Sequence, residues 1–122
     1  MRGYGDSLEG LEMFKPAAVI ASRVISRPSP GLFCLDAGHK AISAEHQRPP
    51  RIMGLTDFTL MTHSEEHMVI ETDERIDVGS VLYLIPHHIC PTVALYDDAL
   101  VVNDNEITDQ WAIQSRTRKI SI

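Results

Sequence analysis

The feature that most constrains the fold is a series of short apolar runs, rich in Val, Ile and Thr, between Ala17 and Ile122. Clusters of Gly, Pro, Asn and Asp interrupt these runs about every eight to twelve residues. β-Branched residues favour an extended backbone, whereas the intervening residue types favour turns. The pattern therefore predicts an all-β chain, folded as an antiparallel β sandwich or barrel with little helix.

The apolar runs predict eight strands, of which the first is the most strongly apolar. They span Ala17–Ser26, Leu32–Asp36, Phe58–Thr62, His67–Thr72, Ser80–Ile85, Thr92–Tyr96, Leu100–Asn103 and Gln110–Arg116. The prolines and glycine within Ser26–Gly31 predict a break after the first strand. Tyr96–Ala99 is predicted to be a tight hairpin turn, and Ala44–Arg51 a surface loop.

A length of 122 residues predicts one domain, because no repeat, low-complexity tract or linker divides the chain. Residues 1–14 contain Leu8, Leu11, Met13 and Phe14. We expect this segment to form one helical turn or an extended lead-in whose apolar side packs on the barrel. Trp111 alternates with Ile113 and is predicted to be a core residue.

The charge balance argues against several classes of partner. Seventeen acidic and eleven basic side chains give a net charge of −6, which repels nucleic acids and anionic membrane surfaces. The sequence shows neither a signal peptide nor an apolar run of the roughly 20 residues that cross a bilayer, so we expect a cytoplasmic protein. In a reducing compartment Cys34 and Cys90 are expected to be free or metal-bound, with a disulfide between them as the alternative.

The first candidate site is Pro86–Pro91, which follows a predicted strand and contains His88 and Cys90. In an extended chain, residues two apart project from the same face, about 7 Å from each other. An imidazole nitrogen and a thiolate suit zinc, and two protein ligands would leave positions for water or substrate. The alternative is that His88 and Cys90 are simply packed, because a free cysteine is usually a small buried apolar residue.

Two other polar segments have simpler interpretations when each is taken alone. His63–His67 is predicted to be a solvated turn between two strands. Asp36–Ser43 is predicted to be a turn in which Asp36 accepts backbone hydrogen bonds and Gly38 permits the change of direction. Lys40 could form a Schiff base only if it were desolvated, and its polar surroundings give no reason to expect that.

The order of these segments resembles the C-terminal β domain of the D-serine dehydratase and D-threonine aldolase family, which are pyridoxal-phosphate enzymes with an alanine-racemase-like fold. The resemblance extends from about Phe14 to Arg116. It rests on the following segments in sequence: Val24–Pro28 with Pro30–Gly31, Asp36–Ser43, Ser64–His67, Gly79–Pro86, His88–Val93, and Trp111 with Arg116.

The resemblance implies a metal site and an absent cofactor domain. Family members carry an N-terminal barrel that binds pyridoxal phosphate through a lysine, and no part of that barrel is present in this sequence. His88 and Cys90 match the two metal ligands of the family, and Cys90 favours the dehydratase branch because aldolases tend to have an aspartate there. Asp36 or Glu66 is expected to orient His88 from a second layer, and His63, His67 or Asp36 could close the site as a third ligand.

Two functions from different classes follow from this resemblance. The chain could be the zinc-binding or other divalent-metal-binding domain of a D-hydroxy-amino-acid lyase, inactive without the cofactor barrel. It could instead be a stand-alone all-β interaction or structural module. In either case we expect it to associate as a homodimer or with a barrel domain, because removal of the barrel should expose apolar surface.

Overall fold

The structure is a computed structural model that describes residues 15–44, 48–117 and 119. The segment predicted for residues 1–14 lies outside this range. The elements follow the order β1 (Ile20–Ser29), β2 (Leu32–Leu35), β3 (Arg51–Ile52), β4 (Thr59–His63), β5 (Met68–Glu71), β6 (Val81–Ile85), α1 (Ile89–Val93), β7 (Asp98–Asn103), β8 (Glu106–Ala112) and a 3-10 turn at Gln114–Arg116.

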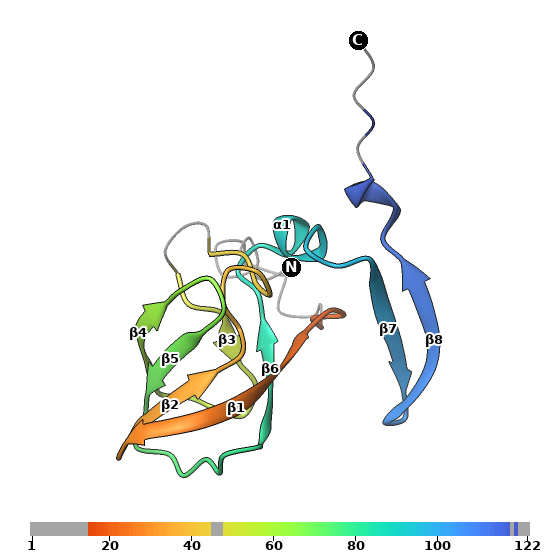
Figure 1. The fold of residues 1–122 in the computed structure, drawn as a ribbon. Coiled ribbons are helices and arrows are strands. Elements are labelled where there is room, and N and C mark those ends of the chain that lie inside the picture. The colour runs from red at the N-terminus through yellow and green to blue at the C-terminus, as the bar shows by residue number, and fades with distance from the viewer. Residues whose placement is uncertain (1–14, 45–47, 118, 120–122) are drawn as a thin grey trace, which may run out of the picture.

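Strands β1 to β6 form one antiparallel sheet in the order β3-β6-β1-β2-β5-β4. The sheet curls around its own buried side, so that it resembles an open barrel (Figure 1). This architecture confirms the prediction of an antiparallel all-β fold with little helix.

The core follows from the two-residue period of the strands. Phe33 pairs with Ile70 and Leu35 with Met68, and all four side chains are buried because alternate residues of β2 and β5 face inward. The core cluster comprises Val24, Phe33, Leu35, Ala37, Ile42, Ile52, Leu55, Met68, Ile70 and Leu84. Ala37 and Ile42 belong to the Asp36–Ser43 loop, which is therefore part of the core and anchors the polar residues between them.

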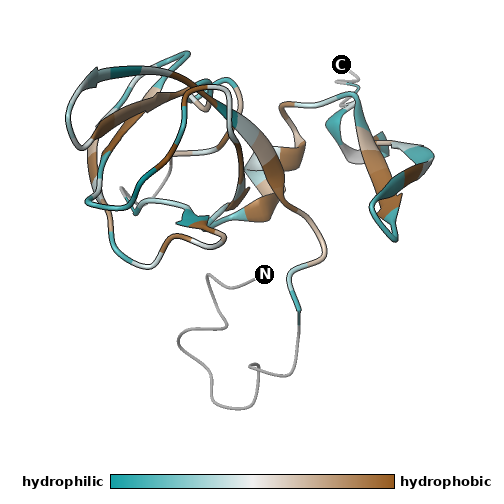
Figure 2. Cartoon of the chain, turned by 90° about the horizontal axis from the view of Figure 1, so that it is seen from below, coloured by the Kyte–Doolittle hydropathy of each residue, from teal (hydrophilic) through white to brown (hydrophobic). Residues whose placement is uncertain are grey.

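Strands β7 and β8 form a separate two-stranded sheet. Figures 1 and 2 both show this hairpin standing clear of the curled sheet. Asp104 and Asn105 form its turn with φ values of +48° and +66°. Both residue types tolerate the left-handed region, and two such residues in succession are typical of the tight turn that suits a twisted hairpin.

Three predictions in this C-terminal region are wrong. Thr92–Tyr96 is not a strand, because α1 occupies Ile89–Val93 and a turn follows it. Pro91 lies in the first turn of α1, where a missing N–H costs the helix no hydrogen bond. The hairpin turn lies at Asp104–Asn105 rather than at Tyr96–Ala99, and Trp111 is 62% exposed instead of buried.

The predicted Ala44–Arg51 loop also ends one residue too late, because Arg51 begins the short strand β3. Two prolines precede this residue, and they masked the strand signal in the sequence. Ile52 nevertheless pairs with Leu84 and fills the core. Among the described residues, no helix has the length and apolar character needed to span a membrane.

Candidate functional site

The proposed ligand segment lies between β6 and α1. Pro86 is buried directly after β6, and His88 precedes the helix with an extended backbone at φ −127° and ψ 114°. Cys90 lies in the first turn of α1 and is an exposed free thiol. The sequence argument that both residues project from one face of a strand is therefore wrong, because the chain becomes helical immediately after His88.

Thr92 fixes the backbone at His88. Its hydroxyl donates to the His88 carbonyl oxygen at 2.9 Å and accepts the Ser43 N–H at 3.2 Å. The Thr92 side chain is completely buried. One hydroxyl therefore links the segment that carries both candidate ligands to the Asp36–Ser43 loop.

A second contact joins the same two parts of the chain. The Tyr96 hydroxyl donates to the Ala41 carbonyl oxygen at 2.8 Å. Burial, with a smaller contribution from the nearby charge of Asp36, raises the pKa of Tyr96. The phenol therefore remains a neutral hydrogen-bond donor over the physiological pH range.

Asp36 anchors the beginning of this loop to β1. One of its carboxylate oxygens accepts the Ser22 hydroxyl at 2.8 Å and the Arg23 N–H at 2.7 Å. The prediction that Asp36 accepts backbone hydrogen bonds is confirmed. Its partners lie in β1, so the carboxylate joins two neighbouring strands instead of closing a local turn.

The Asp36–Ser43 loop is hydrogen-bonded to the turn between β4 and β5. The N–H groups of Gly38, His39 and Lys40 donate to the carbonyl oxygens of Glu66, Ser64 and Glu65, at 3.1, 2.8 and 3.0 Å respectively. Three consecutive residues of one loop are thus hydrogen-bonded to three consecutive residues of the other. Two segments that the sequence separates by more than twenty positions form one rigid unit.

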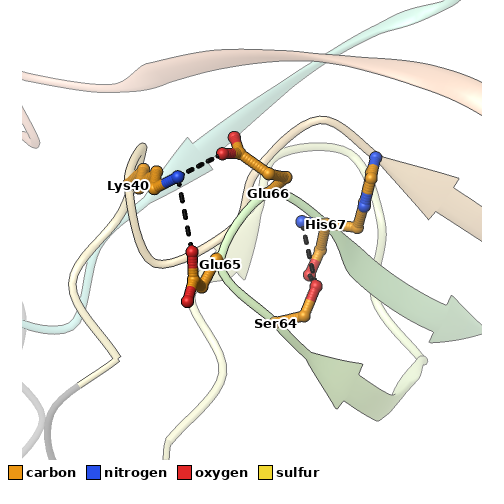
Figure 3. A network of polar contacts seen from close by, with 5 residues as sticks. All are labelled: Lys40, Ser64, Glu65, Glu66 and His67. Carbon is orange, nitrogen blue, oxygen red and sulfur yellow. Dashed lines mark hydrogen bonds and ion pairs between the residues drawn. The ribbon is translucent and has the colours of Figure 1, made fainter.

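Side chains complete this unit on its exposed side (Figure 3). The Lys40 Nζ atom lies 2.5 Å from a Glu66 carboxylate oxygen and 3.4 Å from one of Glu65. These contacts raise the pKa of Lys40, and the Lys40 ammonium lowers the pKa of Glu66. Ser64 bonds to the backbone of His67 within the turn, so the prediction of a solvated polar turn is confirmed for Ser64–His67. It is wrong for His63, which is half-buried at the end of β4.

His63 contacts the same unit through two residues of the Asp36–Ser43 loop. Its Nε2 atom lies 2.9 Å from the Ala37 carbonyl oxygen, and its ring centroid lies 4.2 Å from that of His39. Burial and the neighbouring His39 ring lower the pKa of His63. A neutral imidazole that donates from Nε2 satisfies the Ala37 carbonyl, which gives His63 a structural role that the sequence did not suggest.

The structure thus joins the three polar segments of the sequence into one assembly. Asp36–Ser43 lies at its centre, Ser64–His67 packs on one side and His88–Tyr96 on the other. Glu66 bonds to Lys40, and the Asp36 carboxylate bonds to β1. Over the described part of the chain, no three His, Cys, Asp or Glu side chains gather as a metal-binding group.

Sequence reasoning missed Thr92 and Tyr96 as positioning residues. Their β-branched and aromatic side chains are typical of strands, and that signal predicted a strand there. Only the long-range hydrogen bonds to Ser43 and Ala41 distinguish them. No local pattern in the sequence could have identified these partners.

The donor set at His88 and Cys90 fits zinc, because neutral imidazole and thiolate are both zinc ligands. The lysines do not fit pyridoxal phosphate. A Schiff-base amine must lose its proton, whereas Lys40 is exposed and held as an ammonium by two carboxylates. Lys15 and Lys119 are also exposed to solvent.

Comparison with known proteins gives consistent results. The family described as the putative serine dehydratase domain matches residues 17–102. A D-threonine aldolase from Arthrobacter sp is 35% identical over 117 residues, which are 93% of this chain and 31% of that protein. An uncharacterised protein of Mycobacterium tuberculosis is 30% identical over 109 residues, which are 82% of this chain and 80% of that protein.

Solved structures share the fold. The D-threonine aldolase from Filomicrobium marinum superimposes with a TM-score of 0.79 at 23% identity, covering 89% of this chain and 31% of that one. The D-threo-3-hydroxyaspartate dehydratase from Delftia sp. HT23 gives a TM-score of 0.62 at 19% identity, covering 77% and 31%. This chain spans about 31% of the length of either aldolase. By its matched residues and its fold, the chain belongs to the family of putative serine dehydratase domains.

Proposed function

We propose that this chain is the metal-binding β domain of a D-hydroxy-amino-acid lyase, and that it has no lyase activity without a cofactor-binding barrel. The observation that carries the proposal is that the buried Thr92 hydroxyl, which accepts the Ser43 N–H, donates to the His88 carbonyl oxygen and so fixes the backbone two residues before Cys90. A site built on buried, hydrogen-bonded supports holds its ligands in one geometry, as a catalytic metal requires.

Two solved variants of one structural neighbour support the assignment of the ligands. D-threo-3-hydroxyaspartate dehydratase has been solved as a variant with a histidine replaced by alanine, and as another with a cysteine two positions later replaced. The cysteine variant is described as being in the metal-free form. His88 and Cys90 have the same spacing, and Cys90 favours the dehydratase branch over the aldolase branch.

The residues present indicate which groups of the active site this chain would provide and which a partner would provide. When bound, a zinc-type ion would supply a Lewis acid for a substrate hydroxyl. This chain would provide the imidazole and thiolate ligands, and the Thr92 hydroxyl would keep the His88 backbone in place. A partner would provide pyridoxal phosphate, because the lysines of this chain are unsuited to bind it.

Calorimetric titration of the purified chain with zinc at neutral pH tests the metal site. We expect about one ion per chain with affinity in the micromolar range, because two protein ligands bind a metal only weakly. His88→Ala and Cys90→Ala should each abolish binding and leave the circular dichroism spectrum unchanged. Cys34→Ala, which removes the other free thiol of the chain, is the matched control and should bind normally.

Equal zinc binding by the wild type and both ligand variants would show that the assignment is wrong. Acidification should weaken binding, because protons compete with the metal for the imidazole nitrogen and the thiolate. If a ligand variant still bound zinc and its affinity no longer fell on acidification, the zinc would be bound by groups other than His88 and Cys90.

A second candidate is a stand-alone interaction module. It is favoured by the relative from Mycobacterium tuberculosis, of whose length this chain covers 80%. A chain that associates with a partner but binds no zinc would favour this function. A chain that binds zinc through His88 and Cys90 would favour the lyase domain.

A further inference from the structure

The β7–β8 hairpin carries an apolar face that nothing in the described chain covers. Leu100, Val102 and Ile107 are 60, 62 and 66% exposed. Val102 is the cross-strand partner of Ile107, and Leu100 lies two residues before Val102, so all three share one side of the hairpin. We call these three residues the hairpin face. An isolated two-stranded sheet is only marginally stable in water, so a partner that covered the hairpin face would stabilise it.

A second uncovered apolar surface lies on the outer side of β6 and its neighbours. Val81 and Tyr83 alternate with the inward-facing Leu82 and Leu84, and they are 41 and 49% exposed. The Met53 N–H bonds to the Tyr83 carbonyl oxygen, which places Met53 beside them. We call Met53, Val81 and Tyr83 the Tyr83 face.

The charges around the two faces are opposite. Residues 97–112, which contain the hairpin, include five acidic residues and no Lys or Arg. Strands β1, β3 and β6 contain no Asp or Glu, and two of their arginines, Arg23 and Arg51, lie beside the Tyr83 face. The third, Arg27, lies over the Phe33 ring instead. Arg23 pairs with Val81 across the strands, and Arg51 lies one residue before Ile52 at the edge of the same face.

Within one chain the two faces do not meet. Figures 1 and 2 show the hairpin standing apart from β6 and β1 in two perpendicular views. The Asp97–Arg116 ion pair and the bond from the Ile113 N–H to the Asp97 carbonyl oxygen hold the base of the hairpin. The hairpin is therefore presented to a neighbouring molecule.

From these observations we propose that two copies of this chain associate by exchanging hairpins, so that the acidic hairpin face of each copy covers the arginine-flanked Tyr83 face of the other. A two-fold axis makes this contact twice and closes the assembly as a dimer. Apolar surface leaves water at both contacts, and each acidic rim meets arginines instead of the acidic rim of another hairpin.

Sedimentation velocity over a concentration series tests the dimer, with EDTA present to exclude association through a metal. The double variant Val102→Asp/Ile107→Asp disables the hairpin face, and Tyr83→Asp disables the other face. Met61→Asp is the matched control, because Met61 is an exposed apolar residue on β4, at the far edge of the sheet. Wild type and Met61→Asp should dimerise, and the two disabled variants should each lose at least tenfold in association constant.

Mixing the two disabled variants gives the decisive result. The hairpin variant retains an intact Tyr83 face, and the Tyr83→Asp variant retains an intact hairpin. Their equimolar mixture should therefore form a heterodimer that neither variant forms alone. Failure of the mixture to associate, or a wild type that stays monomeric at high concentration, would overturn the proposal.

Charge reversal provides a test that leaves the apolar packing intact. Arg51→Glu should weaken the wild-type dimer at least threefold at low salt and have a smaller effect at high salt. An unchanged association constant at low salt would overturn the role of charge in the contact. Circular dichroism confirms that each variant is folded, and zinc titration of the same variants in buffer without EDTA reports separately on the proposed metal site.

Discussion

Gly38 lies so close to Glu65 that no other residue fits at this position. A Cβ atom on Gly38 would lie 2.2 Å from the Glu65 carbonyl oxygen. The atoms that this Cβ would meet all belong to the backbone of Glu65 and Glu66, so no side-chain rotation can relieve the clash. The glycine is therefore required by close approach to the β4–β5 turn, and it allows the three consecutive hydrogen bonds between the two loops.

Gly38→Ala should destabilise the fold by about 3 kcal/mol, because the two loops must separate to admit the methyl group. Urea denaturation followed by circular dichroism measures this loss. Gly54→Ala is the matched control, since Gly54 has a φ of +80° and open space around it. It should cost only about 1 kcal/mol, and equal losses in the two variants would contradict the close-contact explanation.

Thr92→Val should lower stability and weaken zinc binding together. The substitution keeps the shape of the side chain but removes the hydroxyl that bonds to His88 and Ser43. Loss of both bonds in a buried position should cost about 2 kcal/mol. Calorimetry and urea denaturation measure the two effects, and Thr59→Val, on the exposed side of β4, should change neither. Unaltered zinc affinity in Thr92→Val would show that the hydroxyl does not position the ligand segment.

The stability of the fold should decrease on mild acidification, because His63 has a lowered pKa in the folded state. The unfolded chain takes up a proton at His63 near pH 6.5, before the folded chain does, so stability falls as the pH drops below this value. His63→Gln removes the titration and retains a donor for Ala37. It should flatten the dependence of the urea midpoint on pH between about 7.5 and 5, and an unchanged dependence would contradict this role of His63.

Lys40 should resist modification by pyridoxal phosphate. Glu66 and Glu65 raise its pKa, and a protonated amine is not nucleophilic. Borohydride reduction followed by mass spectrometry should detect no stoichiometric adduct, and the chain should not turn over D-serine or D-threonine. The Glu65→Gln/Glu66→Gln variant should label faster at Lys40, because its ammonium loses both ion pairs. A stoichiometric Lys40 adduct in the wild type would contradict this expectation.

Local pattern in the sequence determined the strands of the curled sheet. The cores of β1, β2, β4, β5 and β6 lie within the predicted runs, because alternation between inward and outward residues is a property of the strand itself. The same logic failed at Thr92–Tyr96. There, the proline in the first turn and the Thr92 hydroxyl favour a helix, and the strand propensity of the residues was overridden by contacts with Ser43 and Ala41.

The sequence also identified the three polar segments, but only the tertiary structure decided what they do together. Asp36–Ser43 meets Ser64–His67 through backbone hydrogen bonds, and it meets His88–Tyr96 through the side chains of Thr92 and Tyr96, whose partners are backbone groups. Which backbone groups come within reach depends on the path of the whole chain. For the same reason Trp111 alternates like a core residue and yet is exposed, because β7 and β8 form a sheet of their own. Periodicity shows which side of a strand is apolar, and only the packing of the whole chain determines whether that side is covered.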